Sequence, residues 1–392
     1  MSETSFCELK SIVSHLPKSK ILAGDAVNNG RYKFYLSGKK VARSDVAIVD
    51  QDAVVMGDGG VASITFATGK YSYSSHNFGF YSNSDDFLSE YIFRALEQFL
   101  PEIDYKGFVG SGIKNIDKNF LFDLHVEKIS LAEQKKIASI LTSVDEVIEN
   151  TQKQIDKLQD LKKATMNELL TKGIGHTEFK DSELGRIPKS WEIKALSELA
   201  VNGISNGVFN DPKMQGSGYR LINVFDMYQG FGINDQKLKK LKLTEKEFQK
   251  NKVEYGDIFL TRSSLKLEGI AHCNICLTNA NDITYDGHLM KISPNTSIVE
   301  PIFLALQCLS DLGRIFLMRM AKQSTMTTIG QEDIAPLSIV LPPLEEQRTI
   351  IDVHSGFEIR IRHLKTKLMQ TQFLKSSLMQ DLLTGKVRVK VN

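Results

Sequence analysis

The chain contains one long segment twice, and this repeat constrains the fold more than any other feature. Residues Leu131 to Thr171 align with Leu344 to Thr384 at a constant offset and without a gap. Roughly a dozen positions of the two copies are identical, which identifies an internal duplication rather than a chance match.

The duplication extends upstream of this segment. In the same register Ile116 falls on Ile329, and Val126 falls on Ile339. Further back, and with small insertions, His76–Phe80 parallels His288–Ile292. The chain is therefore a globular unit followed by a long helix, and then a second pair of the same kind.

This organisation predicts an α+β protein with two globular domains separated by two long helices, which form an antiparallel coiled coil with pseudo-two-fold symmetry. A length of 392 residues allows two or three domains, each with its own core. Each globular segment mixes short β-branched runs with one helical stretch, near Phe87–Leu100 and near Ile298–Met320. The expected boundaries are 1–130 for the first domain, 131–175 for the central helix, 176–342 for the second domain, and 343–392 for the C-terminal helix and tail.

The apolar residues of both helical segments recur at nearly heptad spacing, which predicts one narrow contact seam on each helix. Polar Thr151 stands where an apolar residue is expected, and Leu161 and Leu374 continue the two stripes. Gly173 and Gly385 are typical helix stops, and each helix would be roughly 60 Å long. The residues expected to pair the helices are Ile137, Leu141, Val144, Ile148, Ile155, Leu158, Phe357, Ile361, Leu364 and Leu368.

Composition indicates an ordinary soluble protein, with 42% apolar residues, 24% charged residues and a net charge of +2. Because no apolar run approaches the roughly 18 residues needed to cross a bilayer, we expect a cytoplasmic protein without membrane contact. Cys273 and Cys276 form a CxxC pair beside His272. Since a second cysteine pair is missing, we expect two partly buried thiols on a strand rather than a zinc site.

Several stretches of both globular segments combine cations, aromatic rings and hydroxyls, the side chains that contact DNA phosphates and base edges. Each stretch taken alone also fits ordinary solvated surface. A run of lysines from Lys237 to Lys252 fits either a phosphate-contacting flank or a solvated helix face. The candidate DNA-binding residues are Arg31, Lys33, Lys39, Lys40, Lys70, Tyr73, Ser75, His76, Asn77 and Lys114 in the first segment, and Tyr219, Arg220, Arg262, Ser263, Ser264, Lys266, His288, Gln323, Ser324, Thr325 and Thr327 in the second.

Two glycine-rich patterns superficially suggest catalysis. Phe108–Gly112 matches the FxGxG pattern of adenosylmethionine-binding methyltransferases, but no Pro-Pro-aromatic motif follows it. Gly57–Ala62 resembles a dinucleotide fingerprint, but the residues after it are β-branched rather than helix-forming. We therefore expect a chain that catalyses nothing and binds no cofactor or metal.

Taken together, the repeats resemble the specificity subunit of type I restriction-modification systems over essentially the whole chain. The motifs that carry the resemblance are Ser130–Gln134, Pro342–Gln347, Asn167–Phe179 and Glu183–Glu192. The resemblance implies two target-recognition domains that read the halves of an interrupted double-stranded DNA sequence. It also implies helices that fix the spacer and dock two modification (methyltransferase) subunits, together with restriction subunits. S-adenosylmethionine, ATP and Mg would then belong to the partner chains.

The first unit departs from the second in being shorter, chiefly before the strand that contains Asp52, which corresponds to Asp257. The first long helix also lacks the double proline that precedes the second one, Pro342 and Pro343. Two alternative functions are a self-sufficient DNA methyltransferase that uses Phe108–Gly112, and a coiled-coil adaptor that binds only protein. The sequence assigns no particular base to any loop residue.

Overall fold

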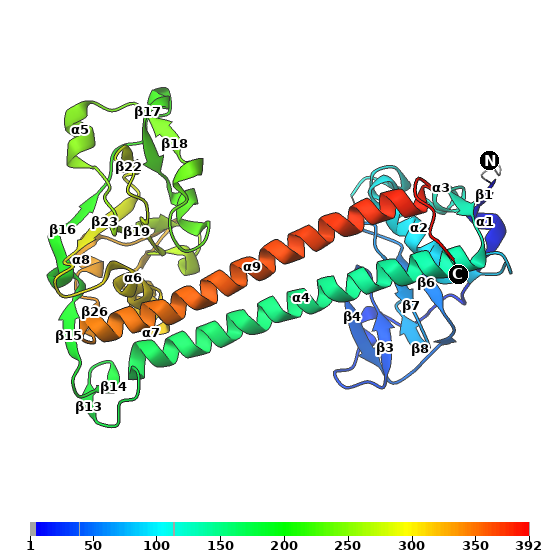
Figure 1. The fold of residues 1–392 in the computed structure, drawn as a ribbon, viewed down its shortest axis with the longest axis horizontal. Helices are drawn as coiled ribbons and strands as arrows, with labels where there is room; N and C mark the ends of the chain where they lie inside the picture. Colours follow the sequence, from blue (N-terminus) through cyan, green and yellow to red (C-terminus); the bar gives the residue numbers. More distant parts are fainter. Residues whose placement is uncertain (1–4, 39, 113, 392) are drawn as a thin grey trace. The chain divides into compact units, whose positions relative to one another are not determined.

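A computed structural model describes residues 5–38, 40–112 and 114–391 of the chain (Figure 1). The chain forms two compact units, the first from residues 1–154 and 364–392 and the second from residues 155–363. Each unit therefore contains half of each long helix.

The two long helices are α4 (Leu131–Lys172) and α9 (Leu344–Leu383), and both begin at the residue that opens the sequence repeat (Figure 1). Gly173 and Gly385 follow the helix ends with φ angles of 69° and 68°. Glycine reaches this left-handed conformation without the steric cost of a Cβ atom, so these residues end the helices as predicted.

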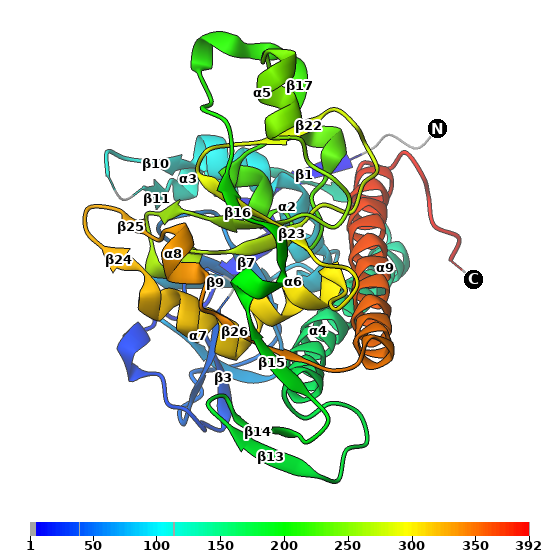
Figure 2. The same cartoon turned by 90° about the vertical axis from the view of Figure 1, so that its left-hand side faces the viewer.

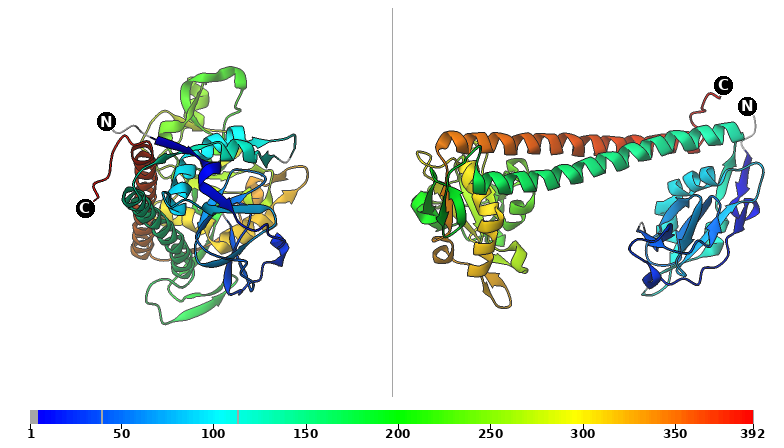
Figure 3. Two further views of the ribbon diagram at one scale, coloured as in Figure 1. Left: turned by 90° about the vertical axis from the view of Figure 1, so that its right-hand side faces the viewer. Right: turned by 90° about the horizontal axis from the view of Figure 1, so that it is seen from below.

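The first unit contains two four-stranded sheets, in the orders β2-β9-β6-β7 and β4-β3-β8-β5. Figure 3 shows this unit in blue and cyan. Helix α2 packs against β6 and β7. The elements are β1 (Ser5–Glu8), α1 (Leu9–Ile12), β2 (Val13–His15), η1 (Ala23–Asp25), β3 (Tyr32–Tyr35), β4 (Val41–Ser44), β5 (Val49–Asp50), β6 (Ala53–Gly57), β7 (Ile64–Ala67), β8 (Lys70–Tyr73), β9 (Asn77–Ser82), α2 (Ser89–Glu102), η2 (Ile103–Gly107), β10 (Phe108–Val109), β11 (Asn115–Ile116), α3 (Lys118–Phe122) and β12 (His125–Lys128).

The second unit contains a four-stranded sheet in the order β16-β23-β19-β21 and a three-stranded sheet in the order β18-β17-β22. Figure 2 faces this unit. Its elements are β13 (Phe179–Ser182), β14 (Gly185–Pro188), β15 (Glu192–Ala195), η3 (Leu196–Leu199), β16 (Ala200–Asn206), η4 (Pro212–Met214), β17 (Gln215–Ile222), η5 (Val224–Tyr228), η6 (Asp235–Lys237), β18 (Lys239–Leu241), α5 (Glu245–Lys250), β19 (Ile258–Thr261), β20 (Ser263–Ser264), η7 (Leu267–Gly269), β21 (Cys273–Ile275), β22 (Ile283–Tyr285), β23 (Leu289–Pro294), α6 (Pro301–Leu309), α7 (Asp311–Met320), β24 (Lys322–Gln323), β25 (Thr327–Thr328), α8 (Gln331–Ile334) and β26 (Ser338–Leu341).

The two units share one topology, which confirms the predicted repeat. The sheet order β2-β9-β6-β7 of the first unit corresponds strand by strand to β16-β23-β19-β21 of the second. In each unit a parallel pair lies in the other sheet, β3 with β8 and β17 with β22. In each unit the strand before the long helix pairs antiparallel with a strand near the start of the globular part, β12 with β1 and β26 with β15.

The helix halves run antiparallel within each unit, as predicted. In the first unit Ile137 and Leu141 of α4 share a core with Leu383 and Met379 of α9. As the residue number rises along one helix, it falls along the other. In the second unit Met166 and Leu170 share a core with Ile350 in the same sense.

Two interhelical ion pairs occupy equivalent positions of the repeat. In the first unit the Lys375 Nζ atom lies 2.6 Å from a carboxylate oxygen of Asp145. In the second unit Lys162 pairs with Glu358. Lys162 aligns with Lys375 in the repeat, and Asp145 aligns with Glu358. Each helix therefore supplies the cation to one pair and the carboxylate to the other.

The residues predicted to pair the helices are all buried or half-buried, although the seam is less continuous than the heptad pattern suggests. Ile137, Leu141, Ile155, Ile361 and Leu364 are buried, and Val144, Ile148, Leu158, Phe357 and Leu368 are half-buried. Buried Thr151 satisfies its hydroxyl by donating to the Val147 carbonyl oxygen at 2.7 Å. The prediction for Leu161 and Leu374 was wrong, since both are exposed. A straight α-helix drifts from a strict seven-residue period, so the stripe leaves the contact seam there.

A buried glutamine joins each long helix to its globular unit. The Gln134 Oε1 atom accepts from the backbone N–H of Leu88 at the start of α2, at 2.8 Å. Its Nε2 atom donates to the carbonyl oxygens of Asp86 and Ile129. Each of the three partners is a backbone group, so the contacts depend on chain path rather than on side-chain identity.

Gln347 makes the same three contacts in the second unit. Its Oε1 atom accepts from the N–H of Glu300 at the start of α6, at 2.8 Å, and its Nε2 atom donates to the carbonyl oxygens of Ile298 and Pro342. Gln134 and Gln347 are both fully buried. The glutamine of each helix start therefore holds the first turn of the long helix against the N-terminus of a domain helix.

The structure also divides one predicted helical stretch and adds one element. The helical stretch of the second unit is two helices rather than one, because the Ser310 side chain caps α7 by accepting from the Gly313 N–H at 3.1 Å. The β13–β14 hairpin, visible at the bottom of Figure 2, has no counterpart among the described residues of the first unit.

Within the described ranges, no single helix has both the length and the apolar composition of a membrane span.

We predict that Gln347→Leu destabilises the junction of α9 and α6, because it leaves three backbone partners of the amide without their bonds. The expected cost is about 1–3 kcal/mol. In hydrogen exchange, the Glu300 amide should lose protection while the Leu88 amide keeps it. Gln134→Leu should give the reverse pattern.

The control is Gln372→Leu, since Gln372 is an exposed glutamine of the same helix. It should leave both amides protected. Equal loss of protection in all three variants would contradict the role of the buried glutamines.

We predict that the second unit loses stability as the pH falls from about 6.5 towards 4, because His354 is buried against Phe231. Burial, aided by the nearby charge of Lys162, lowers the pKa of His354 to about 4. In the unfolded chain the imidazole is protonated near its ordinary pKa of 6.5. Between these values the unfolded chain binds more protons, so acid favours unfolding, whereas the contribution is fully present above pH 6.5.

The test is the thermal unfolding of the second unit as a function of pH. His354→Leu introduces the residue found at the equivalent position of the first copy, buried Leu141. This variant should show a shallower loss of stability below pH 6.5, and His363→Leu at an exposed position should not. An unchanged pH profile in His354→Leu would refute the assignment.

Candidate nucleic-acid interface

The candidate cations of the first unit lie on its surface. Arg31, Lys33, Lys40 and Lys114 are exposed. The Arg31 guanidinium lies 5.9 Å from the ring centroid of Tyr32, so it is partly oriented by an aromatic neighbour. Lys70 is also exposed and pairs with Asp50 at 3.7 Å, while Ser75 is half-buried and His76 is exposed.

Two candidates of the first unit lie in its interior, which corrects the expectation that they present their polar tips to DNA. Tyr73 is fully buried, and its hydroxyl donates to the Pro17 carbonyl oxygen. Asn77 is buried, and its Oδ1 atom accepts from the hydroxyls of Ser74 and Ser37. Tyr73 ends strand β8, in which three consecutive residues are buried, and Asn77 opens strand β9. Lys39 lies outside the described residues.

In the second unit, candidates from three distant segments meet at one place. Strand β25 pairs with both β20 and β24, which brings Ser264 and Gln323 to the same three-stranded sheet. Ser263, Ser264, Lys266 and His288 line a hollow of about 650 Å³ at its edge. Gln323, Ser324 and Thr325 are exposed on the hairpin. The expectation that Thr327 contacts DNA was wrong, because this residue is buried.

The loop that carries Ser263 to Lys266 is anchored on its C-terminal side. Arg314 of α7 donates to the carbonyl oxygens of Ala271 and Glu268, at 2.7 and 3.1 Å. The Tyr228 hydroxyl donates to the Gly269 carbonyl oxygen at 2.7 Å. Because these contacts order the backbone before any ligand arrives, the loop loses little conformational entropy on binding.

The neighbouring side chains of Arg262 and His288 are held less tightly. The Arg262 guanidinium donates to the Gly287 carbonyl oxygen at 3.3 Å. The His288 Nδ1 atom lies 2.9 Å from a carboxylate oxygen of Asp286, while the His288 side chain is 67% exposed. The three-stranded sheet and this loop therefore present a mixed cationic, hydroxyl and amide surface of the type that contacts DNA.

Tyr219 and Arg220 lie elsewhere, on β17, and their polar groups are already engaged. Tyr219 stacks on Phe248 at 3.7 Å between ring centroids. Arg220 binds both carboxylate oxygens of Asp282 and also contacts Asp235. The hydrogen bonds from Arg220 lower the pKa of Asp282. We correct the expectation for Arg220, because its guanidinium supports the fold instead of facing a ligand.

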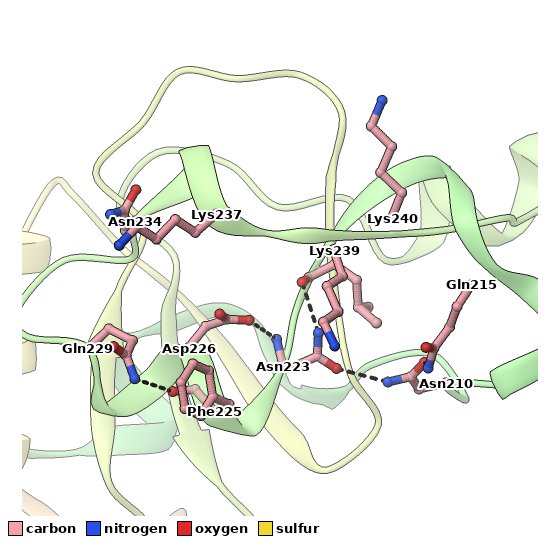
Figure 4. A pocket seen from close by; sticks show the side chains of 11 residues that line it. Asn210, Gln215, Asn223, Phe225, Asp226, Gln229, Asn234, Lys237, Lys239 and Lys240 are labelled. Atoms are coloured by element: carbon pink, nitrogen blue, oxygen red, sulfur yellow. Dashed lines mark hydrogen bonds between the residues drawn. The ribbon is translucent and has the colours of Figure 1, made fainter. Parts of the chain in front are cut away.

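A second hollow of the same unit was not predicted from the sequence. It has a volume of about 530 Å³, and Figure 4 shows the side chains that line it. Its lining is rich in amides and lysines: Asn210, Gln215, Leu221, Asn223, Phe225, Asp226, Gln229, Asn234, Lys237, Lys239 and Lys240. The amides lie several residues apart in the sequence, so their only sequence signal is a high local content of Asn and Gln. We refer to this hollow as the amide–lysine cleft.

A chain of hydrogen bonds connects the two hollows. Asn210 donates to Asn223 at 2.8 Å and to Asp286 at 3.0 Å, and accepts from Gln215 at 2.8 Å. The other carboxylate oxygen of Asp286 contacts His288. The short helix η5 supplies Val224 and Tyr228 to one hollow, and Phe225 to the other.

The structure also places the lysine run. Lys239 and Lys240 lie on strand β18, and only Lys246 and Lys250 lie on helix α5. The interpretation of a single solvated helix face was therefore wrong. The lysine run and most residues of the cleft lie between β17 and β19, a segment that is longer than the matching one between β3 and β6 of the first unit. Asn210 precedes β17, and Gln215 and Leu221 lie on it.

Equivalent backbone positions carry different chemistry in the two units. The Asp58 N–H donates to the His76 carbonyl oxygen, and its carbonyl oxygen accepts from Ile116. Arg262 makes the matching bonds with His288 and Ile329. The first unit thus places a carboxylate where the second places a guanidinium. The loops differ although the strands that hold them correspond.

The glycine-rich segments do not adopt catalytic geometries. Phe108 belongs to β10, which pairs antiparallel with β11 in a short hairpin equivalent to β24–β25. Gly57–Ala62 leads into strand β7 rather than into a helix. Both observations argue against nucleotide-binding loops, which need a following helix N-terminus.

The two cysteines of the CxxC pair are more deeply buried than expected, and only Cys273 lies on a strand, since Cys276 follows the end of β21. Cys273 belongs to the main core of the second unit, and Cys276 belongs to a separate cluster with Phe259. Burial raises the pKa values of both thiols. The described residues contain no group of three or more potential metal ligands.

Comparison with known proteins agrees with this architecture. The family described as the type I restriction modification DNA specificity domain matches residues 1–160 and 188–370. The type I restriction enzyme MjaVIII specificity subunit of Methanocaldococcus jannaschii is 25% identical over 364 residues, which span 90% of this chain and 82% of that protein. The EcoKI specificity subunit of Escherichia coli K12 is 24% identical over 259 residues, 62% of this chain and 52% of that protein.

Solved structures share the fold over nearly the full length. The S subunit of a type I restriction-modification system from M. genitalium has a TM-score of 0.65 at 14% identity, and the match covers 97% of this chain and 96% of that one. The family match covers most of this chain, in both units. The protein therefore belongs to the type I restriction-modification DNA specificity family, and its role is DNA sequence specificity rather than catalysis or protein-only adaptation.

Proposed function

We propose that this protein reads a bipartite, gapped double-stranded DNA target, with one half-site for each globular domain. The observation that carries the proposal is the repeat of one topology with different loops, as at Asp58 and Arg262. Two domains with the same framework but different contact residues can bind two different base sequences on one duplex.

In this proposal the second domain contacts its half-site through the β20–β25–β24 sheet and the adjoining loop. Arg262 and Lys266 supply cations, and Gln323 supplies an amide that can pair with adenine. The first domain uses Arg31, Lys33, Lys40 and Lys114. Neither set is strongly basic, so tethering two modest binding sites on one chain provides the affinity.

The long helices would set the gap between the half-sites and dock two modification subunits, with restriction subunits joining the assembly. A helix keeps a fixed rise per residue, so it can hold a distance that a flexible linker cannot. S-adenosylmethionine, ATP and Mg would act in the partner chains, in the cytoplasm. The relatives named above are specificity subunits of type I enzymes, which supports this division of labour.

Methylation-sensitive sequencing of DNA from cells that carry this chain should reveal a motif with two constant parts separated by a gap. Replacing both Arg262 and Gln323 by alanine should relax or change one part and leave the other intact, because only the second domain is altered. Loss of a specific contact typically costs about 1–3 kcal/mol in base discrimination.

Arg319→Ala is the matched control, because Arg319 is an exposed arginine of the same unit on α7. It should leave both motif parts unchanged. A continuous motif, or methyl transfer to DNA by the isolated chain with labelled S-adenosylmethionine, would argue against the proposed function.

The spacer role predicts that lengthening both helices lengthens the gap without altering either half-site. Seven residues, one heptad, can be inserted after Ile148 in α4 and after Thr371 in α9. Both insertions fall between the two interhelical ion pairs, so each unit keeps its own pair. The added rise of roughly 10 Å should extend the gap by at most about three base pairs.

The gap is read from the methylation motif of cells that carry the lengthened chain. A heptad inserted in α4 alone is the control, and it should impair assembly because the paired segments no longer match. An active protein with the original gap and both insertions would exclude the spacer role.

A further inference from the structure

The amide–lysine cleft of the second unit contains several polar side chains that make few or no contacts with other described residues. Residues of η5, η6 and β18 line it, and in Figure 4 Lys239 points toward Asn223 whereas Lys240 points away. Phe225 is 73% exposed at this cleft. An exposed aromatic ring beside several amides and ammonium groups is typical of a surface that binds another molecule.

The lysines of the cleft supply positive charge that the fold leaves free. Lys237, Lys239 and Lys240 are exposed, and none of them forms a salt bridge with a residue that the structure describes. Lys239 lies beside Asn223 in Figure 4. Burial raises the pKa of nearby Asp226, and the positive charge of Lys239 offsets this rise only in part. The charge of the lysines is therefore not consumed by an internal ion pair.

The amides divide into a supporting group and a free group. Asn210 uses both hydrogens of its Nδ2 atom and also accepts a bond, and Asn223 accepts one of those bonds. These two residues support the wall of the cleft. Among the described residues Gln229 makes one long contact of 3.4 Å, from Nε2 to the Phe225 carbonyl oxygen. The Asn234 Oδ1 atom caps η6 by accepting from the Gln236 N–H, and its Nδ2 atom makes no bond to a described residue.

The combination of free lysines and free amides matches two distinct parts of DNA. Ammonium groups neutralise phosphates without sequence preference, whereas a glutamine or asparagine amide can form two bonds to an adenine edge. The cleft lies on the same domain as the β20–β25–β24 sheet and is connected to it through Asn210, Asp286 and His288.

We propose that the amide–lysine cleft is a second DNA-contacting site of the second domain. Lys237 and Lys239 bind the phosphate backbone, and Gln229 and Asn234 contact adenine-containing base pairs of the half-site. This inference rests on the proposed function, since it assumes that this domain binds one half-site. Most residues of the cleft lie between β17 and β19, a segment longer than the matching one between β3 and β6 of the first unit, so the second half-site has contacts that the first lacks.

The lysine role is tested with the complex of this chain and its modification subunits, on a duplex that carries the methylation motif. A non-specific duplex of equal length serves as the comparison. Lys237→Ala with Lys239→Ala should weaken binding to both duplexes and reduce the slope of log affinity against log salt by about 2. Lys246→Ala with Lys250→Ala, which removes two lysines of the same run on α5, should leave the slope unchanged.

The amide role predicts a different result. Gln229→Ala with Asn234→Ala should keep the salt slope and lower the preference for the motif duplex over the non-specific one by about 5- to 150-fold. The loss should map to base pairs of one half-site. Circular dichroism of each variant reports whether the fold is intact.

The outcomes separate the inference from the proposed function. If the unaltered complex prefers no DNA sequence, the proposed function fails. If the complex prefers its motif but cleft variants with intact folds bind it with unchanged slope and preference, the cleft is not a DNA site and the inference is overturned.

Discussion

The architecture depends on one repeated interaction, a buried glutamine at the first turn of each long helix. Gln134 and Gln347 each connect three backbone groups that belong to a domain helix start and to the strand that enters the long helix. A buried amide without partners is costly, so the side chain strongly favours the one arrangement that satisfies it. A long helix can transmit orientation only when its junction with the domain is fixed, and these bonds fix it.

Around these junctions the two copies stabilise the same geometry with different chemistry. In the first unit buried Arg94 bonds to Glu97 and Thr142 and pairs with Asp145, and Lys375 contacts both carboxylates. In the second unit Gln307 donates to the carbonyl oxygens of Leu170 and Val340, and His354 packs on Phe231. A buried ion network can specify a unique arrangement without adding much stability, whereas the neutral contacts avoid the cost of burying charge.

Much of the fold was predictable because the repeat compares the chain with itself. The starts of α4 and α9, the glycines after them and the correspondence of β9 with β23 all follow from aligned residues. Exposure along the helices was harder to predict. Leu161 and Leu374 fit the heptad pattern but are exposed, because side-chain spacing gives the direction of a side chain only while the helices remain in register.

The candidate site was predictable only in part, because sequence shows the chemistry of a side chain but not its partners. Ser263, Ser264, His288 and Gln323 do meet, whereas Arg220 is engaged by two carboxylates that lie far from it in the sequence. Tyr73 has the side-chain chemistry of a contact residue but is buried, since strand β8 is covered on both faces and the sequence does not show what packs against it. The lysines of the amide–lysine cleft belong to a run that the sequence shows, but its amides were missed, because they come together only when η5, η6 and β18 bring them to one place.

The division between a constant framework and variable loops has a physical basis. The strands and the glutamine junctions are fixed by burial and by backbone hydrogen bonds, so a change there costs stability. The chain path at Asp58 and at Arg262 is fixed by the same pair of backbone hydrogen bonds, so the side chain can change charge while the path stays the same. A duplicated unit of this kind can acquire a new contact surface in one copy, as the segment between β17 and β19 has done, without disturbing the helices that join the copies.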